Sequence, residues 1–124
     1  MRKGRILIVD DEPDITNSYS LCLEDTGLFE VEAYNDSVEA LSKFKSNSYK
    51  LVILDIKMPM MSGFELYDKL RKLDSKVKIC FMSGFDINSA ELGEQFTSLE
   101  IECFIPKAIH IKELVQRIDA ELLR

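Results

Sequence analysis

The chain has 124 residues, of which 46% are hydrophobic, and a formal net charge of −6. A chain of this length can form one domain with its own core, which predicts a single unit over residues 1–124. The acidic balance argues against nucleic acid or an anionic membrane as a direct partner, because phosphate groups are bound by basic surfaces. No apolar run approaches the length of a transmembrane helix, and the basic start lacks the apolar stretch of a secretory signal. We therefore expect a cytoplasmic protein.

The cysteines favour the same location. Cys22, Cys80 and Cys103 are odd in number and have no C-x-x-C spacing, which argues against disulfides and against zinc. We expect all three to be buried thiols, as in proteins of the reducing cytosol.

Short apolar runs alternate with helical patterns from the start of the chain. Residues 6–9 form an apolar run typical of a buried parallel strand. Pro13 opens a helix that ends near Gly27, with an inner face of Ile15, Tyr19, Cys22 and Leu23. Residues 29–33 alternate in polarity, which predicts a strand nearer an edge of the sheet.

Two helices in the middle of the chain carry N-terminal capping signals. Asp36 can cap a helix whose inner face comprises Val38, Leu41 and Phe44. A third strand follows over residues 51–54 and ends at Asp55. Ser62 can cap the next helix, with buried positions Phe64, Leu66, Leu70 and Leu73.

The last part of the chain continues the alternation. Residues 77–82 predict a fourth strand, residues 86–99 a ragged helix, and residues 102–105 a fifth strand. The final helix has a clear apolar stripe of Ile111, Leu114, Val115, Ile118 and Leu122. The whole pattern predicts an α/β fold: one doubly wound parallel sheet of five strands with five helices on its two faces.

Polar residues follow four of these strands. Asp10 and Asp11 close the first strand, Asp55 the third, Ser83 the fourth, and Lys107 lies just past the fifth. Because ligands of open parallel sheets bind at the carboxyl ends of the strands, we expect these side chains to converge. Clustered carboxylates repel one another by roughly 1 kcal/mol per pair in water and about 4 kcal/mol when half-buried, so they favour a hard cation such as Mg²⁺.

The same set of residues could support phosphoryl chemistry. Asp55 could attack phosphorus as a carboxylate nucleophile while Asp10 and Asp11 hold Mg²⁺. Lys107 could pair with one phosphoryl oxygen, and Ser83 could donate a hydrogen bond to another.

At these positions the chain resembles the response-regulator receiver domains of two-component signalling, and the likeness covers nearly all of it. The motifs that carry the resemblance are Ile8-Val9-Asp10-Asp11-Glu12-Pro13, Leu54-Asp55-Ile56-Lys57-Met58-Pro59 with Gly63, Met82-Ser83-Gly84, and Ile105-Pro106-Lys107. The resemblance implies a flavodoxin-like strand order of 2-1-3-4-5.

The resemblance also implies roles at the acidic end of the motif set. Asp55 would accept a phosphoryl group from the phosphohistidine of a sensor histidine kinase or a phosphotransfer protein. Asp10, Asp11 and Asp55, together with the backbone carbonyl of Lys57, would bind Mg²⁺. Such a domain would catalyse its own phosphorylation and slow dephosphorylation without turning over external substrates.

Output would follow from a change at Ser83 and Phe104, which match the switch residues of the family, while Lys107 matches its lysine. That change would alter binding to a downstream protein partner or to an output domain, or would promote a phosphorylation-dependent dimer. A stand-alone protein and a piece of a longer regulator both remain open.

The sequence departs from the family pattern after the lysine. Ala108 stands where a proline is usual, and Pro106 precedes the lysine instead. We expect the Lys107–Ala108 bond to stay cis, as it is before proline in the family.

Three alternatives come from other protein classes. A haloacid-dehalogenase-type phosphatase needs D-x-D after its first strand, which Asp10-Asp11-Glu12 does not provide. A flavodoxin-like nucleotide or FMN carrier would want a first loop rich in glycine or hydroxyl groups, and acids in that loop would repel a phosphate. The third alternative is a pseudo-receiver that binds proteins without phosphorylation, whose usual mark is the loss of the acids present here.

Overall fold

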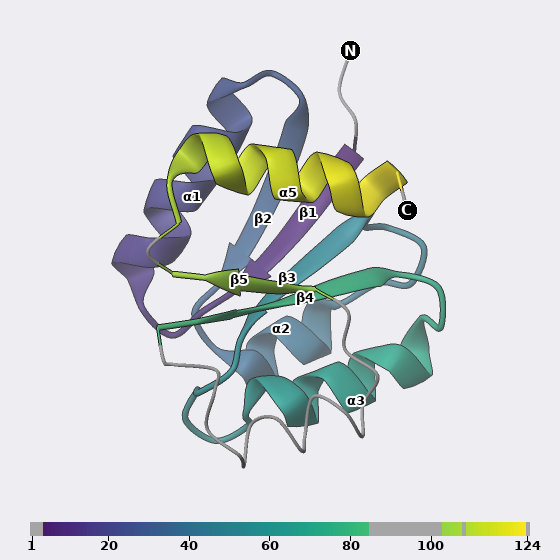
Figure 1. Cartoon of the computed structure of the whole chain (residues 1–124). Coiled ribbons are helices and arrows are strands. Elements are labelled where there is room, and N and C mark those ends of the chain that lie inside the picture. Colours follow the sequence, from purple (N-terminus) through teal and green to yellow (C-terminus); the bar gives the residue numbers. More distant parts are fainter. Residues whose placement is uncertain (1–3, 85–102, 108, 124) are drawn as a thin grey trace.

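The computed structural model describes residues 4–84, 103–107 and 109–123. Within them, five parallel strands lie in the order β2-β1-β3-β4-β5 (Figure 1), which confirms the predicted doubly wound sheet. The strands are β1 (Gly4–Val9), β2 (Phe29–Tyr34), β3 (Leu51–Asp55), β4 (Lys78–Ser83) and β5 (Phe104–Pro106). The helices are α1 (Pro13–Asp25), α2 (Ser37–Lys43), α3 (Gly63–Leu73) and α5 (Ile111–Leu123). The predicted helix over residues 86–99 lies outside the described residues.

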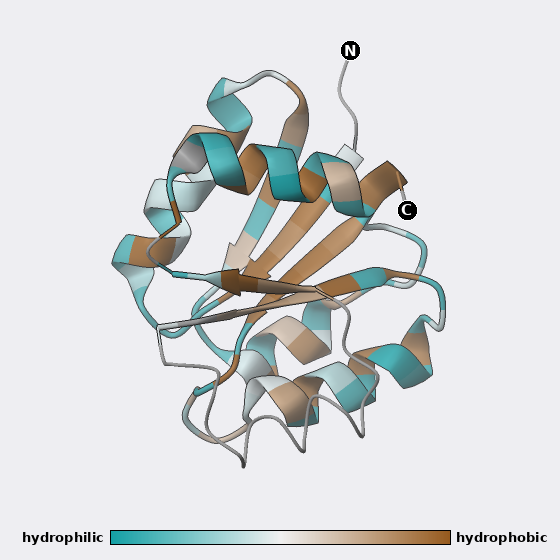
Figure 2. Ribbon diagram, viewed as in Figure 1, coloured by the Kyte–Doolittle hydropathy of each residue, from teal (hydrophilic) through white to brown (hydrophobic). Residues whose placement is uncertain are grey.

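The helices form a layer on each face of the sheet. Helices α1 and α5 cover one face, and α2 and α3 cover the other (Figure 1). Successive residues of β1 alternate between the two cores, so Ile6 and Ile8 face α1 and α5, whereas Leu7 and Val9 face α2 and α3. Figure 2 shows the central strands as almost uniformly hydrophobic, which follows from burial on both sides.

The local signals for helix starts are confirmed. Pro13 lies in the first turn of α1, where a backbone N–H would have no partner within the helix, so its absence costs nothing. The Asp36 carboxylate accepts hydrogen bonds from the backbone N–H groups of Val38 and Glu39, and the Ser62 hydroxyl accepts one from Glu65. No helix among the described residues is both long and apolar enough to cross a bilayer.

Single positions of the predicted inner faces were wrong. Val38 is 45% exposed and Leu73 is 54% exposed, although both are apolar. In α2 the buried positions belong to the small residues Ser37 and Ala40, which allow close approach to the sheet. The other predicted positions do pack against the core: Leu41 and Phe44 in and after α2, and Phe64, Leu66 and Leu70 in α3. Hydrophobicity alone therefore misassigned single positions at the margin of each face.

The prediction of three buried thiols was also wrong. Cys80 and Cys103 form a disulfide with their Cα atoms 4.6 Å apart, and Cys22 is exposed. The register pairs Phe81 with Phe104, so the two preceding cysteines lie opposite each other on adjacent strands and face the same core. The physical reason is strand pairing, which the spacing of cysteines along the chain does not reveal.

Gly63, the first residue of α3, packs directly against the strand that carries Asp55. Its N–H donates to the carbonyl of Ile56 over 2.8 Å. A Cβ at this position would lie 2.1 Å from the backbone oxygen of Asp55, closer than any real contact. Glycine is therefore required here by the close approach of helix to strand.

We expect Gly63→Ala to lower the free energy of unfolding by about 1–3 kcal/mol, because α3 or the end of β3 must shift to admit the methyl group. The matched control is Gly84→Ala, where the nearest atom to an added Cβ is Lys107 Cδ at 3.7 Å, an ordinary contact. Urea unfolding followed by circular dichroism measures both. Equal stability of the two variants would contradict this account.

Candidate functional site

Three carboxylates meet at the carboxyl ends of β1 and β3. These strands are neighbours, with Val9 opposite Leu54, so the residues that follow lie side by side. An oxygen of each of Asp10, Asp11 and Asp55 lies within 4.8 Å of the others. Asp10 is 1% exposed and Asp55 is 4% exposed, whereas Asp11 is half-buried. The predicted convergence of these acids is therefore present in the structure.

The Lys107 ammonium is placed among these acids. Its Nζ lies 3.1 Å from Asp10 Oδ2 and 3.4 Å from Asp55 Oδ2. It also forms an ion pair with Glu12 Oε1 at 2.9 Å, a partner that sequence reasoning did not include. Only 14% of the lysine side chain is exposed, so screening by water is weak and one positive charge offsets part of the repulsion.

The backbone of Lys107 is held from another element. The Tyr19 hydroxyl, on α1, donates a hydrogen bond to the Lys107 carbonyl over 2.5 Å. The sequence placed Tyr19 on the inner face of its helix but gave no signal of a polar role. The Lys107–Ala108 bond involves residue 108 and lies outside the described residues, so the expected cis geometry stays a prediction.

Asp10 is held by hydrogen bonds from its own loop and from the loop after β2. Its Oδ1 accepts the backbone N–H of Glu12 over 2.9 Å. The side-chain amide of Asn35 donates to the Asp10 carbonyl over 2.8 Å and to the Thr16 hydroxyl over 2.9 Å. Sequence reasoning missed Asn35, whose position after β2 at the same edge of the sheet was an available signal.

Burial perturbs the titration of both acids. Burial, followed by the negative charge of Asp10, raises the pKa of Asp55 to about 7 despite the opposing effect of Lys107. Burial likewise raises the pKa of Asp10, although the hydrogen bond from the Glu12 N–H and the Lys107 ammonium both act to lower it. For Lys107, burial alone would lower the pKa, but the bonds to Glu12 and Asp10 outweigh it and the net pKa is raised.

The donor set fits a hard divalent cation. Asp10 Oδ2 is buried without a well-directed hydrogen bond in the part of the chain that the structure describes, although Lys107 lies 3.1 Å away. The three acids offer only oxygen ligands, which suit Mg²⁺. Asp11 and Lys57 both line a hollow of about 480 Å³ beside the acids, together with Ile56, Met58, Pro59, Ser62 and Phe64.

Two further predicted site residues lie near this edge. The backbone of Ser83 ends β4 opposite Pro106, but its side chain lies outside the described residues. Phe104 on β5 is half-buried and packs against the core formed with α2 and α3.

The family model described as "Response regulator receiver domain" matches residues 6–119. The chain belongs to this family. It is a receiver domain of a response regulator in two-component signalling, as the sequence motifs predicted.

Relatives of known name agree with this assignment. The transcriptional regulatory protein CpxR homolog of Haemophilus influenzae is 38% identical, over 98% of this chain and 51% of the relative. The uncharacterized transcriptional regulatory protein YkoG of Bacillus subtilis is 35% identical, over 98% of this chain and 52% of the relative. The chain thus spans about half the length of these curated relatives.

Solved structures show the same fold. A CheY-like receiver domain protein from Methanospirillum hungatei aligns with a TM-score of 0.86 and 33% identity, covering 96% of this chain and 93% of that chain. The response regulator TrrA of Thermotoga maritima, solved in complex with Mg²⁺-BeF, aligns with a TM-score of 0.80 and 32% identity. That alignment covers 95% of this receiver domain and 98% of TrrA.

The raised pKa of Asp55 predicts a pH-dependent stability in metal-free buffer. Its folded value of about 7 exceeds the ordinary 3.8, so between these values the folded state binds more protons than the unfolded state. The stabilising contribution is complete below about pH 4 and is lost as the pH rises through 7. Thermal melts in EDTA from pH 4.5 to 7.5 should show the melting temperature falling.

Asp55→Asn should remove most of that decline, because the amide does not titrate. Asp68→Asn is the control, since Asp68 lies on the exposed side of α3 in an ion pair with Lys72. An unchanged slope in Asp55→Asn would show that another group carries the pH dependence.

Proposed function

We propose that Asp55 accepts a phosphoryl group from the phosphohistidine of a sensor histidine kinase or a phosphotransfer protein, with Mg²⁺ bound beside it. The observation that carries this proposal is the placement of Lys107 Nζ, 3.4 Å from Asp55 and 3.1 Å from Asp10, in a buried cluster of acids. A nucleophile, a counter-charge and candidate metal ligands are thus available in one small volume. The domain covers residues 1–124.

In the proposed transfer, an Asp55 oxygen attacks phosphorus while the bond from the histidine nitrogen to phosphorus breaks. The product is an acyl phosphate, and the nitrogen keeps the bonding electron pair. Asp55 must be ionised to attack, and Lys107 favours that form by its positive charge. When bound by Asp10, Asp11, Asp55 and the Lys57 carbonyl, Mg²⁺ would neutralise charge on the phosphoryl oxygens.

Lys107 has a second role in the phosphorylated state. Phosphorylation removes the negative charge of the Asp55 carboxylate and brings the anionic oxygens of the phosphoryl group to the same place. The ammonium, which is a compact charge on a flexible stem, can then pair with one of these oxygens. Ser83 would donate a hydrogen bond to another, and Phe104 would change rotamer as that residue moves.

The output of this switch would be a change in protein binding at the Ser83–Phe104 face. Relatives with transcriptional names are about twice as long as this chain, which supports an output domain or a separate downstream partner. A phosphorylation-dependent dimer is a further form of the same output. We place the protein in the cytoplasm, where a kinase and a regulator of transcription would meet.

The alternative is a pseudo-receiver that acts as a binding module without phosphorylation. The acids and Lys107 are all present and brought together, which favours the phosphoryl switch. The haloacid-dehalogenase and flavodoxin-like alternatives are not favoured by the family assignment.

Bound Mg²⁺ should stabilise the folded domain because it relieves repulsion among the acids. At a hundred times its dissociation constant the stabilisation is about 2.7 kcal/mol. Thermal melts with Mg²⁺ or EDTA measure the shift, and Asp11→Asn should abolish it. Lys57→Ala is the matched control, since it keeps the backbone carbonyl and should keep the shift. Coincident melting curves for the unaltered chain would contradict the metal site.

Acetyl phosphate with Mg²⁺ should add one phosphoryl group to the protein, seen by intact mass. The adduct should be labile to hydroxylamine, as acyl phosphates are, and absent from Asp55→Asn. Asp68→Asn, which removes a surface carboxylate instead, should be modified like the unaltered chain. Full modification of Asp55→Asn would refute the choice of acceptor.

A further inference from the structure

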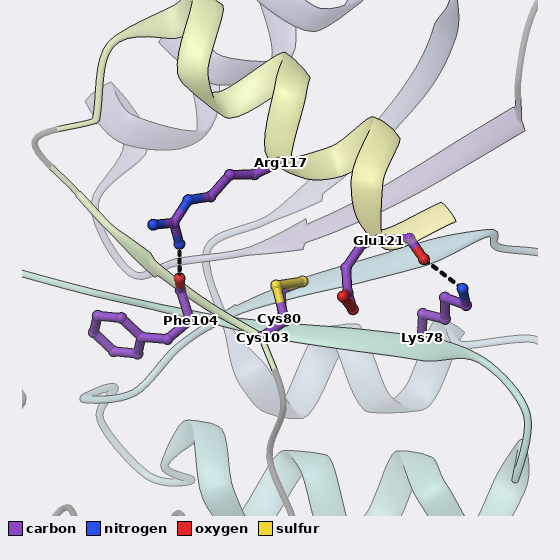
Figure 3. The surroundings of a disulfide bond; sticks show 6 residues. All are labelled: Lys78, Cys80, Cys103, Phe104, Arg117 and Glu121. Carbon is purple, nitrogen blue, oxygen red and sulfur yellow. Dashed lines mark hydrogen bonds between the residues drawn. A yellow bond between two sulfur atoms is a disulfide. The ribbon is translucent and has the colours of Figure 1, made fainter. Parts of the chain in front are cut away.

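A disulfide joins the last two strands of the sheet. Cys80 on β4 and Cys103, just before β5, are bonded across 23 residues of sequence. Figure 3 shows the bond beneath α5, with Glu121 beside it. Both cysteines are buried, at 0% and 8% exposure, in the core that includes Leu114 and Ile118 of α5. The phosphoryl chemistry proposed above makes no use of this bond.

The strand that follows Cys103 is short and stands at the end of the sheet order. β5 is three residues long, Phe104–Pro106, and stands last in the sheet order. Beside the disulfide, the backbone N–H of Phe81 donates to the Cys103 carbonyl over 3.0 Å. A short terminal strand gains little from pairing alone, so a covalent bond at its start adds to the contacts that hold it.

Helix α5 is attached to both strands around the same point. The Lys78 ammonium donates to the backbone carbonyl of Glu121, and the Arg117 guanidinium donates to the backbone carbonyl of Phe104 (Figure 3). The disulfide thus lies where β4, β5 and α5 meet. Breaking this bond would therefore affect the packing of all three elements.

The strand leads directly to the functional site. Lys107 follows Pro106 at the end of β5 and lies four positions after Cys103. Its ammonium must be held within hydrogen-bond reach of Asp10 and near Asp55, which needs β5 in its present register. The disulfide and the site lysine therefore lie at the two ends of one strand of three residues.

We propose that Cys80–Cys103 is a reversible redox site whose disulfide fixes β5 and thereby positions Lys107. A dithiol reductant breaks the S–S bond and forms two thiols, giving two electrons and two protons while it becomes a disulfide itself. A small-molecule disulfide such as oxidised glutathione reverses the step and leaves as two thiols. In the reduced state, β5 opens more often because its cross-link to β4 is gone.

The first test counts thiols in the Cys22→Ser chain, which removes the exposed third cysteine. After equilibration with oxidised glutathione, alkylation in denaturant should add no groups. After dithiothreitol, it should add two. Two added groups under both conditions would overturn the proposal, because no disulfide would then exist to be switched.

The second test asks whether the bond controls β5. Amide hydrogen exchange at Phe104 and Ile105 should be about tenfold or more faster in the reduced protein, because local opening becomes easier. The melting temperature should fall by on the order of 10 °C, as expected for a cross-link that closes a loop of this length. The double variant Cys80→Ala, Cys103→Ala should behave like the reduced protein in both reagents. Equal exchange in the two redox states would overturn the control of β5.

The last test addresses Lys107 and is the only step that rests on the proposed function. Beryllofluoride with Mg²⁺ mimics the phosphoryl group, and its affinity should be several-fold weaker in the reduced protein. Equal affinity in both states would overturn the effect on Lys107. Absence of binding in both states would instead count against the proposed function, while thiol counts and exchange still decide the redox site.

Discussion

The functional edge of this receiver domain depends on one electrostatic arrangement, in which the Lys107 ammonium lies between the buried carboxylates Asp10 and Asp55. One positive charge cannot neutralise three acids, so the site keeps an excess of negative charge. Burial, together with the negative charge of Asp10, raises the pKa of Asp55. An excess of negative charge on oxygen ligands suits the binding of a divalent cation.

The fold supplies this arrangement through backbone geometry. Parallel strands bring their carboxyl ends to one edge of the sheet. The residues that follow β1 and β3 therefore lie close together in space although they are far apart in sequence. Gly63 allows α3 to approach the backbone of Asp55, and the Tyr19 hydroxyl holds the carbonyl of Lys107. The Cys80–Cys103 bond joins β4 to the residue before β5, the strand that leads to this lysine. Each of these contacts helps to position residues of the site, and none of them adds a charge to it.

The sequence predicted what depends on pattern and missed what depends on pairing. Apolar runs and capping residues such as Asp36 and Ser62 were sufficient to predict the helices and strands, because those signals are local. Polar residues at strand ends were sufficient for Asp10, Asp55 and Lys107, because sheet topology brings them together. The disulfide was missed since it needs the register of two strands, although the predicted order 2-1-3-4-5 already made them neighbours. The roles of Tyr19 and Asn35 depend on single side-chain hydrogen bonds, for which no periodic signal exists.

The central claim is that Asp55 is held in an excess of negative charge that a divalent cation relieves. The direct measurement is the titration of the Asp55 carboxyl carbon by NMR, in protein labelled at aspartate, with and without Mg²⁺. The account predicts a midpoint of about 7 in EDTA and a much lower midpoint with saturating Mg²⁺. A midpoint near the ordinary 3.8 in EDTA, unchanged by Mg²⁺, would contradict it.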